Sequence, residues 1–210
     1  MEDLLIWVDE NDNEIGYGEK METHKKGQLH RAFSIFIFDW TDATMLLQRR
    51  AHEKYHSGGL WSNACCSHPR KGESMDTAIN LRLETELGLK TNCHIVDSNV
   101  CGLLMDGGDV IYGCGSFQYS ASFGELSENE MDHVFLYSPD FGGFRKQDFS
   151  FNPDEIEDAK WISIKELNQW MEERPQDFTA WFQTAFDLAY DVLCRQARDR
   201  DMFFNFRSQG

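Results

Sequence analysis

One amphipathic helix with a signal at each end constrains the fold of this chain more than any other feature. Ile79, Leu83 and Leu87 recur every four residues, so they share one helical face. The helix is predicted to begin near Ser74 and to end at Gly88, which favours the left-handed conformation that closes many helices. Its apolar stripe therefore needs a partner surface in the rest of the chain.

The remainder of the chain is predicted to combine strands with further helices. The segment at 33–38 is rich in aromatic and β-branched residues and is typical of a central strand. A capping-box pattern from Ser163 to Glu166 opens another helix, and a long helix is predicted to start near Phe178, after Pro175. Further strands are predicted at 4–8, 14–17, 45–49, 110–119, 131–137 and 161–162. The fold class is thus a mixed one, α+β or α/β.

Length and charge indicate one domain that does not bind nucleic acid or a membrane. The 210 residues can bury a sizeable core, and no linker of Pro, Gly and Ser divides them. We expect a single domain over 1–210, with its core at about 5–197 and a polar tail at 198–210. The net charge of −16 argues against general binding to nucleic acid or to an anionic membrane, and no apolar run could span a bilayer.

The cysteines and the N-terminal residues indicate a reducing compartment. The six cysteines are irregularly spaced and two of them, Cys65 and Cys66, are adjacent, which is not the pattern of a disulfide framework. The first residues carry neither a basic segment nor a signal-peptide core. We therefore expect a cytoplasmic protein.

Three histidines and two glutamates could form a metal cage beside a reactive thiol. Cys66 lies two residues before His68, shortly after the apolar Leu60 and Trp61. Taken singly, each histidine is more often an ordinary surface or core residue, and two glutamates at alternate strand positions could simply face solvent. Few chemistries combine such a cage with a thiol. The candidate ligands are His24, His30, His68, Glu128 and Glu130.

The helix at 74–87 resembles a degenerate Nudix box, a strand–loop–helix motif whose glutamates hold Mg²⁺ on a diphosphate. The matching positions are Glu73, Glu86, Gly88 and Leu89. The departures are Leu81-Arg82 at an Arg-Glu pair of the motif, Thr85 at a glutamate and Ser67 at a glycine. A hydrolase needs clustered carboxylates to bind metal and to activate water. Only Glu86 remains well placed, so pyrophosphate hydrolysis is disfavoured.

Several motifs follow one another in an order typical of one branch of the Nudix-fold enzymes. Members of that branch do not hydrolyse their substrate. They are Glu19-Lys20-x-x-x-His24, Leu29-His30-Arg31-Ala32-Phe33-Ser34, Gln48-Arg49-Arg50-Ala51, Leu60-Trp61-Ser62-Asn63-Ala64-Cys65-Cys66-Ser67-His68-Pro69, Glu84-Thr85-Glu86-Leu87-Gly88, Glu128-Asn129-Glu130 and Trp181. From about residue 5 to about 197 the chain resembles the type I isopentenyl-diphosphate Δ-isomerases. The resemblance implies a Nudix-like mixed β-sheet sandwiched by helices. It also implies conversion of isopentenyl diphosphate to dimethylallyl diphosphate in isoprenoid biosynthesis.

The resemblance implies two kinds of metal site and a basic pocket. One divalent ion would be held tightly by the five candidate ligands, whose imidazole and carboxylate donors suit Zn²⁺ or Mn²⁺, with Mg²⁺ as a further candidate. A second ion, Mg²⁺, would bridge the substrate diphosphate and Glu86. Without the resemblance, Arg82 and Glu86 could equally form an ordinary salt bridge on the helix. The cations expected to bind the diphosphate are Lys20, Arg50, Lys54 and Arg82.

The expected catalytic residues flank the hydrocarbon of the substrate. Cys66 would occupy one face, with Glu130 and Tyr119 on the other as a proton donor pair. Trp181 would present its ring to the carbocation that develops during the reaction. The ordinary alternative for Trp181 is a core aromatic residue. Cys65, its side chain on the opposite strand face from Cys66, is expected to be a small buried hydrophobe.

Two other functions stay open from the sequence. One is a Nudix-type diphosphate hydrolase, and the other is a non-catalytic relative that binds metal or prenyl diphosphates. The expected partner is a small prenyl diphosphate, and the chain is expected to be a monomer or a weak homodimer.

Overall fold

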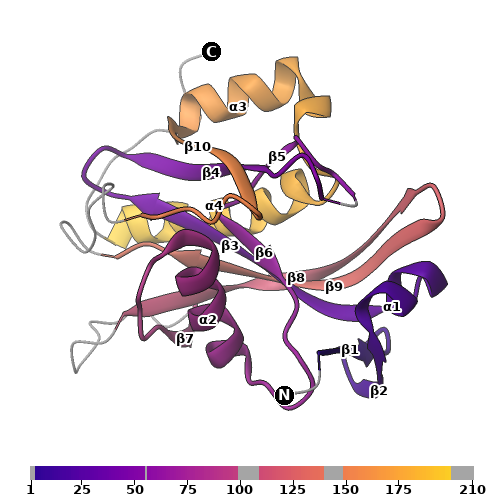
Figure 1. Cartoon of the computed structure of the whole chain (residues 1–210). Helices are drawn as coiled ribbons and strands as arrows, with labels where there is room; N and C mark the ends of the chain where they lie inside the picture. Colours follow the sequence, from indigo (N-terminus) through magenta and orange to yellow (C-terminus); the bar gives the residue numbers. More distant parts are fainter. Residues whose placement is uncertain (1–2, 55, 99–108, 140–148, 200–210) are drawn as a thin grey trace.

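The computed structural model describes residues 3–54, 56–98, 109–139 and 149–199, which form one ten-stranded mixed sheet with helices on both faces (Figure 1). The strands are β1 (Leu4–Val8), β2 (Glu14–Glu19), β3 (His30–Asp39), β4 (Thr44–Arg50), β5 (Trp61–Ser62), β6 (Cys65–Ser67), β7 (His94–Asp97), β8 (Val110–Phe123), β9 (Leu126–Tyr137) and β10 (Ile156–Ser163). The helices are α1 (Lys20–Lys26), α2 (Met75–Leu87), α3 (Ile164–Glu173) and α4 (Phe182–Asp199), with a short 3-10 helix, η2 (Pro175–Asp177).

The sheet is mixed because its two central strands run parallel while most other neighbours run antiparallel. Along the main path the order is β10-β4-β3-β9-β8-β7. β3 pairs in parallel with β9, and β9 pairs with β8 in a long antiparallel hairpin. On the other side, β3 pairs antiparallel with β4 and with the short β6. This arrangement brings the starts of β3 and β9 next to β6, where the predicted ligands lie.

Strand β3 separates two hydrophobic cores because successive side chains of a strand point to opposite faces. Phe36 and Phe38 join the core formed with α3 and α4. Phe33, Ile35 and Ile37 join the other core, which includes the apolar face of α2. In Figure 1, α2 accordingly lies on one side of the sheet, with α3 and α4 on the other. The apolar sequence at 33–38 is thus explained by burial on both faces, and the predicted sandwich is confirmed.

The predicted helix ends are confirmed by their capping contacts. Ser74 precedes α2 and accepts a hydrogen bond from the backbone N–H of Thr77, while Gly88 ends the helix with φ at 67°. Ser163 and Glu166 form the predicted capping box at the start of α3. Most predicted strands are present and several extend further than expected, notably β8 and β9. The expected core limit lies close to the end of α4 at Asp199, and residues 200–210 lie outside the described residues.

The prediction that the last helix starts near Phe178 is wrong, because α4 begins at Phe182. Phe178 is extended, with φ at −108° and ψ at 156°. The backbone N–H of Thr179 donates to the carbonyl of Trp61 at 3.0 Å, which ties this stretch to β5 and delays the helix. Helix α1 and strand β7 were not predicted from the sequence.

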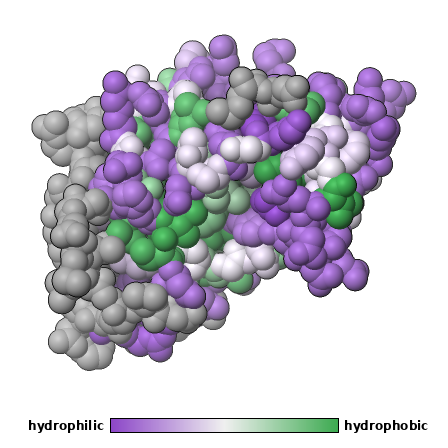
Figure 2. Space-filling model, turned by 90° about the horizontal axis from the view of Figure 1, so that it is seen from below, coloured by the Kyte–Doolittle hydropathy of each residue, from purple (hydrophilic) through white to green (hydrophobic). Residues whose placement is uncertain are grey.

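The face seen from below is mainly hydrophilic, with hydrophobic areas of limited size between polar side chains (Figure 2). The cysteines in the described ranges all carry free thiols, while Cys101 lies outside them. Among the described helices, none combines the length and the apolar character that crossing a membrane would need.

Candidate active site

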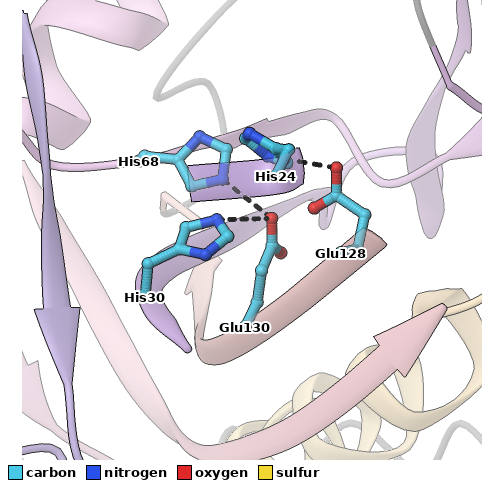
Figure 3. Close-up of side chains that lie close together, drawn as sticks. All are labelled: His24, His30, His68, Glu128 and Glu130. Atoms are coloured by element: carbon cyan, nitrogen blue, oxygen red, sulfur yellow. Dashed lines mark hydrogen bonds and ion pairs between the residues drawn. The ribbon is translucent and has the colours of Figure 1, made fainter. Parts of the chain in front are cut away.

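Five predicted ligands, located on or next to four elements of the fold, converge in one buried cluster (Figure 3). Helix α1 supplies His24, and β3 begins with His30. His68 directly follows β6, and Glu128 and Glu130 lie on the same side of β9. One nitrogen or oxygen atom of each lies within 4.8 Å of the others. All five side chains are buried, so the cluster is a closed site rather than an exposed acidic surface.

The hydrogen bonds of the histidines fit a bound cation. Nδ1 of His24 lies 2.6 Å from the carbonyl of Lys20, and Nδ1 of His30 lies 2.8 Å from the carbonyl of Gln28. Each Nδ1–H can donate to its carbonyl, which leaves the Nε2 lone pair facing the cluster, as in many metal sites. Burial holds the pKa of His68 well below its usual range, against the opposing charge of Glu130. A neutral imidazole is the form that binds a metal.

The buried carboxylate of Glu128 also fits a bound cation. Within the described part of the chain, neither of its buried oxygens makes a hydrogen bond of good geometry, and nor does Nε2 of His30. Burying an anion without compensation is costly. The donor set, three imidazoles and two carboxylates, suits a divalent transition ion and would satisfy these atoms.

Glu130 faces two environments with its two oxygens. Oε1 lies 2.7 Å from Nε2 of His68 and 3.5 Å from Nε2 of His30. Oε2 accepts a hydrogen bond from the Tyr119 hydroxyl at 2.5 Å. The contact follows from register, because Tyr119 on β8 stands directly opposite Glu130 on β9. The glutamate therefore joins the buried cluster to the adjoining cavity.

That cavity has a volume of about 440 Å³ and includes Cys66, Tyr119, Glu130 and Trp181 in its wall. Asn63 orders two of them, because its Oδ1 accepts from the Cys66 thiol at 3.0 Å and from Nε1 of Trp181 at 3.2 Å. Its amide nitrogen donates to two backbone carbonyls, which fixes the orientation of that oxygen. Burial raises the pKa of Cys66 to about 11, against the opposing charge of Arg50.

The other part of the cavity wall is basic, although the whole chain is acidic. The four predicted cations all line it, and Arg70, which was not predicted, is a fifth. Lys54 pairs with Glu155, and Arg70 pairs with Asp3. Burial lowers the pKa of Lys20, and the nearby charges of Arg70 and Lys54 lower it further. Five converging cations form a pocket for a highly charged anion. The predicted cations are Lys20, Arg50, Lys54 and Arg82.

One carboxylate of the Nudix motif, Glu86, reaches this basic pocket from α2. Burial, and then the charge of Glu155, raise its pKa to about 7. Thr85 stands beside it where the motif has a further glutamate. Glu73 serves the loop instead, because its side chain accepts from the backbone N–H of Arg70 at 2.9 Å. The carboxylate cluster that hydrolysis needs is thus incomplete at these positions.

Comparison with known proteins places this site in a family. Residues 28–182 match the NUDIX domain model. Isopentenyl-diphosphate Delta-isomerase 1 of Aromatoleum aromaticum is 44% identical, over 93% of this chain and 96% of the relative. The chain belongs to the type I isopentenyl-diphosphate Δ-isomerase family. A second relative supports this membership. The isopentenyl-diphosphate Delta-isomerase of Serratia proteamaculans is 38% identical, over 94% of this chain and 98% of its own.

Solved structures support the Nudix fold of this isomerase family member and nothing beyond the fold. A Deinococcus radiodurans protein aligns over 91% of this chain and 98% of its own, with a TM-score of 0.57 and 15% identity. A MutT NUDIX hydrolase from Burkholderia pseudomallei aligns over 77% of this chain and 98% of its own, with a TM-score of 0.52 and 16% identity.

Every residue predicted for the isomerase site lies in the buried cluster or in the wall of the cavity. The two neighbouring arginines separate, since Arg50 lines the cavity and Arg49 pairs with Glu157 outside it. Cys65 is fully buried in the core beside α2, as predicted. Sequence reasoning missed Arg70, His56 and the role of Asn63. Only Asn63 carried a signal, because it lies within the matched motif.

Proposed function

We propose that this chain isomerises isopentenyl diphosphate to dimethylallyl diphosphate, in isoprenoid biosynthesis. The observation that carries the proposal is one cavity with acid–base groups in one part of its wall and cations in another. Cys66, Tyr119 and Glu130 line the first part, and the five cations line the second. The printed activities of the curated relatives agree with it. A hydrolase is not favoured, because Thr85 and Glu73 do not complete a carboxylate cluster around Glu86.

The reaction moves a hydrogen in two steps, which requires groups on both faces of the substrate. A donor gives a proton to C4, the alkene electrons form the new C–H bond, and C3 becomes a tertiary cation. A base then removes a proton from C2, and those electrons form the new double bond. We assign donation to the Tyr119–Glu130 pair and removal to Cys66. In support, the pair shares a 2.5 Å hydrogen bond, and the charge of Arg50 favours the thiolate of Cys66 against burial.

Trp181 is assigned to stabilise the cation at C3. Its ring is 3% exposed and lines the cavity, with the Tyr119 ring 5.7 Å away between centroids. The guanidinium carbon of Arg50 already lies 5.4 Å from its centroid, so the ring accommodates a neighbouring cation. Cation–π attraction contributes about 2 kcal/mol or more where the pair is desolvated.

Binding of the diphosphate is assigned to the basic part of the cavity wall. Lys20, Arg50, Lys54 and Arg82 would neutralise its oxygens, with Glu86 placed to hold an accompanying Mg²⁺. The buried cluster would hold a second divalent ion, Zn²⁺ or Mn²⁺, with Mg²⁺ as an alternative. When bound, this ion supplies positive charge beside Glu130. The five ligands and Glu86 thus belong to two separate metal sites.

Product analysis tests the proposed activity. The purified protein is incubated with isopentenyl diphosphate and Mg²⁺, and the products are separated and identified. Dimethylallyl diphosphate is the expected product. Isopentenyl monophosphate with inorganic phosphate would instead establish a hydrolase, and unchanged substrate bound to the protein would establish a non-catalytic relative.

Metal analysis of two variants tests the assignment of two sites. His68→Ala should lower the content of tightly bound divalent metal in the purified protein, because it removes one of the five ligands. Glu86→Gln should leave that content unchanged and weaken the Mg²⁺ dependence of substrate binding. Full metal content in the His68 variant would show that the cluster is not the tight site.

We further propose that the chain works as a monomer or a weak homodimer in the cytoplasm. Within the described residues, only four large hydrophobic side chains are exposed: Ile15 and Tyr17 on β2, Met21 on α1 and Leu81 on α2. Sedimentation velocity at micromolar concentration tests this, and a tight dimer or larger assembly would contradict it.

A further inference from the structure

A fourth histidine, His56, reaches the buried cluster from a loop that the family motifs do not include. It lies between β4 and β5 and is 8% exposed. Its Nε2 lies 2.6 Å from Oε1 of Glu128, closer than Nε2 of His24, which lies at 3.2 Å from the same oxygen. Of these two imidazoles, the one nearer to the carboxylate oxygen thus belongs to a residue outside the set of five ligands.

The loop is built to hold His56 in this place. The backbone N–H of Gly59 donates to the carbonyl of Arg50 at 2.9 Å, which closes the loop at its base. At Gly58 a Cβ atom would lie 2.4 Å from the carbonyl oxygen of His52, so the backbone can pass there only without a side chain. Ser57 adopts the left-handed region with φ at 51°. Such a constrained path fixes the position from which the imidazole projects.

The ring of His56 also has a defined orientation. Its Nδ1 lies 3.4 Å from Oγ of Ser57, on the opposite side of the ring from Glu128. The ring packs against Phe123 at 5.3 Å between centroids, and edge-on against Trp181 at 6.2 Å. These aromatic neighbours pack beside the contact of Nε2 with Glu128 and keep the ring close to the carboxylate.

We propose that His56 is a positioning residue that holds Glu128 for the metal ion. Its Nε2 lies in polar contact with Oε1 of Glu128 at 2.6 Å and restricts the movement of a carboxylate that is 1% exposed. A polar neighbour of this kind, outside the ligands themselves, orients a ligand and raises metal affinity. His56 does not belong to the group whose ligand atoms lie within 4.8 Å of one another. It therefore acts on the ion through Glu128.

This role links the two halves of the site. The loop that carries His56 also carries Lys54 and follows Arg50, which line the basic part of the cavity. The contact with Glu128 thus ties the segment that would bind the diphosphate to the cluster that would bind the metal. The inference rests on the proposed metal site but not on the isomerase reaction.

The test measures binding of Zn²⁺ alone, by competition with a chromogenic chelator, in the parent protein and three variants. His56→Leu removes the donor and should weaken Zn²⁺ binding about 10- to 100-fold. His56→Gln keeps an N–H at a similar reach and should restore most of the affinity. His52→Leu is the matched control, because His52 is exposed on the same loop and should bind Zn²⁺ as the parent does.

Three results would overturn the inference. One is Zn²⁺ binding by His56→Leu within twofold of the parent. Another is equal weakening in His56→Leu and His56→Gln, which would mean that the donor is not what matters. The third is a parent protein that binds no Zn²⁺. The melting temperatures of the metal-free variants separate the effect from misfolding, and the assay does not depend on whether the protein isomerises or hydrolyses its substrate.

Discussion

The hydroxyl of Tyr119 donates to one oxygen of Glu130 at 2.5 Å, while the other oxygen faces the buried histidines. The register of β8 and β9 sets this pairing, since the two residues are direct cross-strand partners. Under the proposed function, a carboxylate shared in this way would transmit the charge of a bound ion to the hydroxyl assigned to proton donation. The relationship would then be the structural link between the metal cluster and the acid–base chemistry.

Removing only the hydroxyl of Tyr119 should separate proton donation from metal binding. Tyr119→Phe should lower kcat about 10²- to 10⁴-fold, the usual contribution of a positioned proton-transfer group. The metal content should not change, because the contacts of Oε1 with the histidines remain. Tyr17→Phe is a suitable control, since that hydroxyl donates to Glu14 at the surface. Loss of bound metal in Tyr119→Phe, or unchanged kcat, would contradict the assignment.

The adjacent cysteines provide a matched pair of substitutions. Cys66 lines the cavity, whereas Cys65 is fully buried and its thiol donates to Glu86 at 3.4 Å. Cys66→Ala should abolish measurable turnover and leave the fold and diphosphate affinity nearly intact. Cys65→Ala should mainly reduce stability, by about 1 kcal/mol, and keep most of the activity. Steady-state kinetics with thermal melts would decide, and equal activity losses in two folded variants would refute the role of Cys66.

Trp181 should matter for the transition state more than for the substrate, because the ground-state alkene carries no charge. Trp181→Leu keeps an apolar side chain but removes the ring face, so kcat should fall more than KM rises. Affinity for an ammonium analogue of the substrate should fall markedly, and Trp181→Phe should be milder. Equal weakening of substrate and analogue in Trp181→Leu would make this residue a packing element only.

Glu86 should make the stability of the metal-free protein depend on pH. Its pKa of about 7 in the folded chain lies above the ordinary value of 4.5, so the folded state holds this proton more tightly. The stabilisation is complete below pH 4.5 and is lost as pH rises through 7. The difference between these two pKa values corresponds to a change of about 3 kcal/mol at most in the free energy of unfolding.

Chemical denaturation of the Glu86→Gln variant measures this effect. After metal removal, its free energy of unfolding should exceed that of the parent at pH 8. The difference should shrink toward zero as pH falls below 4.5, where Glu86 is protonated in both states. A difference that does not change with pH would show that burial of Glu86 has no ionisation cost.

Local rules made much of the fold predictable from sequence. Periodicity and capping residues predicted α2, because Ser74 and Gly88 stabilise its ends through contacts close in sequence. The apolar strand β3 was predictable for a similar reason, since both of its faces are buried. The start of α4 was not, because the hydrogen bond from Thr179 to Trp61 joins residues far apart in the chain.

The candidate site likewise contains residues that the sequence predicted and residues that it did not. The order of motifs identified the ligands and the four cations, through resemblance to a family. Arg70 and His56 were missed because their roles depend on tertiary placement. Arg70 joins the cavity where its backbone bridges to Leu5 of β1, and His56 reaches Glu128 only because its loop closes against β4. Single residues of common type, outside any motif, give no signal of such contacts.

Isomerisation in D₂O tests whether the protein donates a solvent-exchangeable proton to C4 of the substrate. The protein is incubated with isopentenyl diphosphate and Mg²⁺ in D₂O, and the product is examined by ¹H and ²H NMR. The account predicts dimethylallyl diphosphate with deuterium in the methyl group derived from C4, because the donor group exchanges its proton with solvent. Release of phosphate, or dimethylallyl diphosphate without deuterium at that methyl, would contradict it.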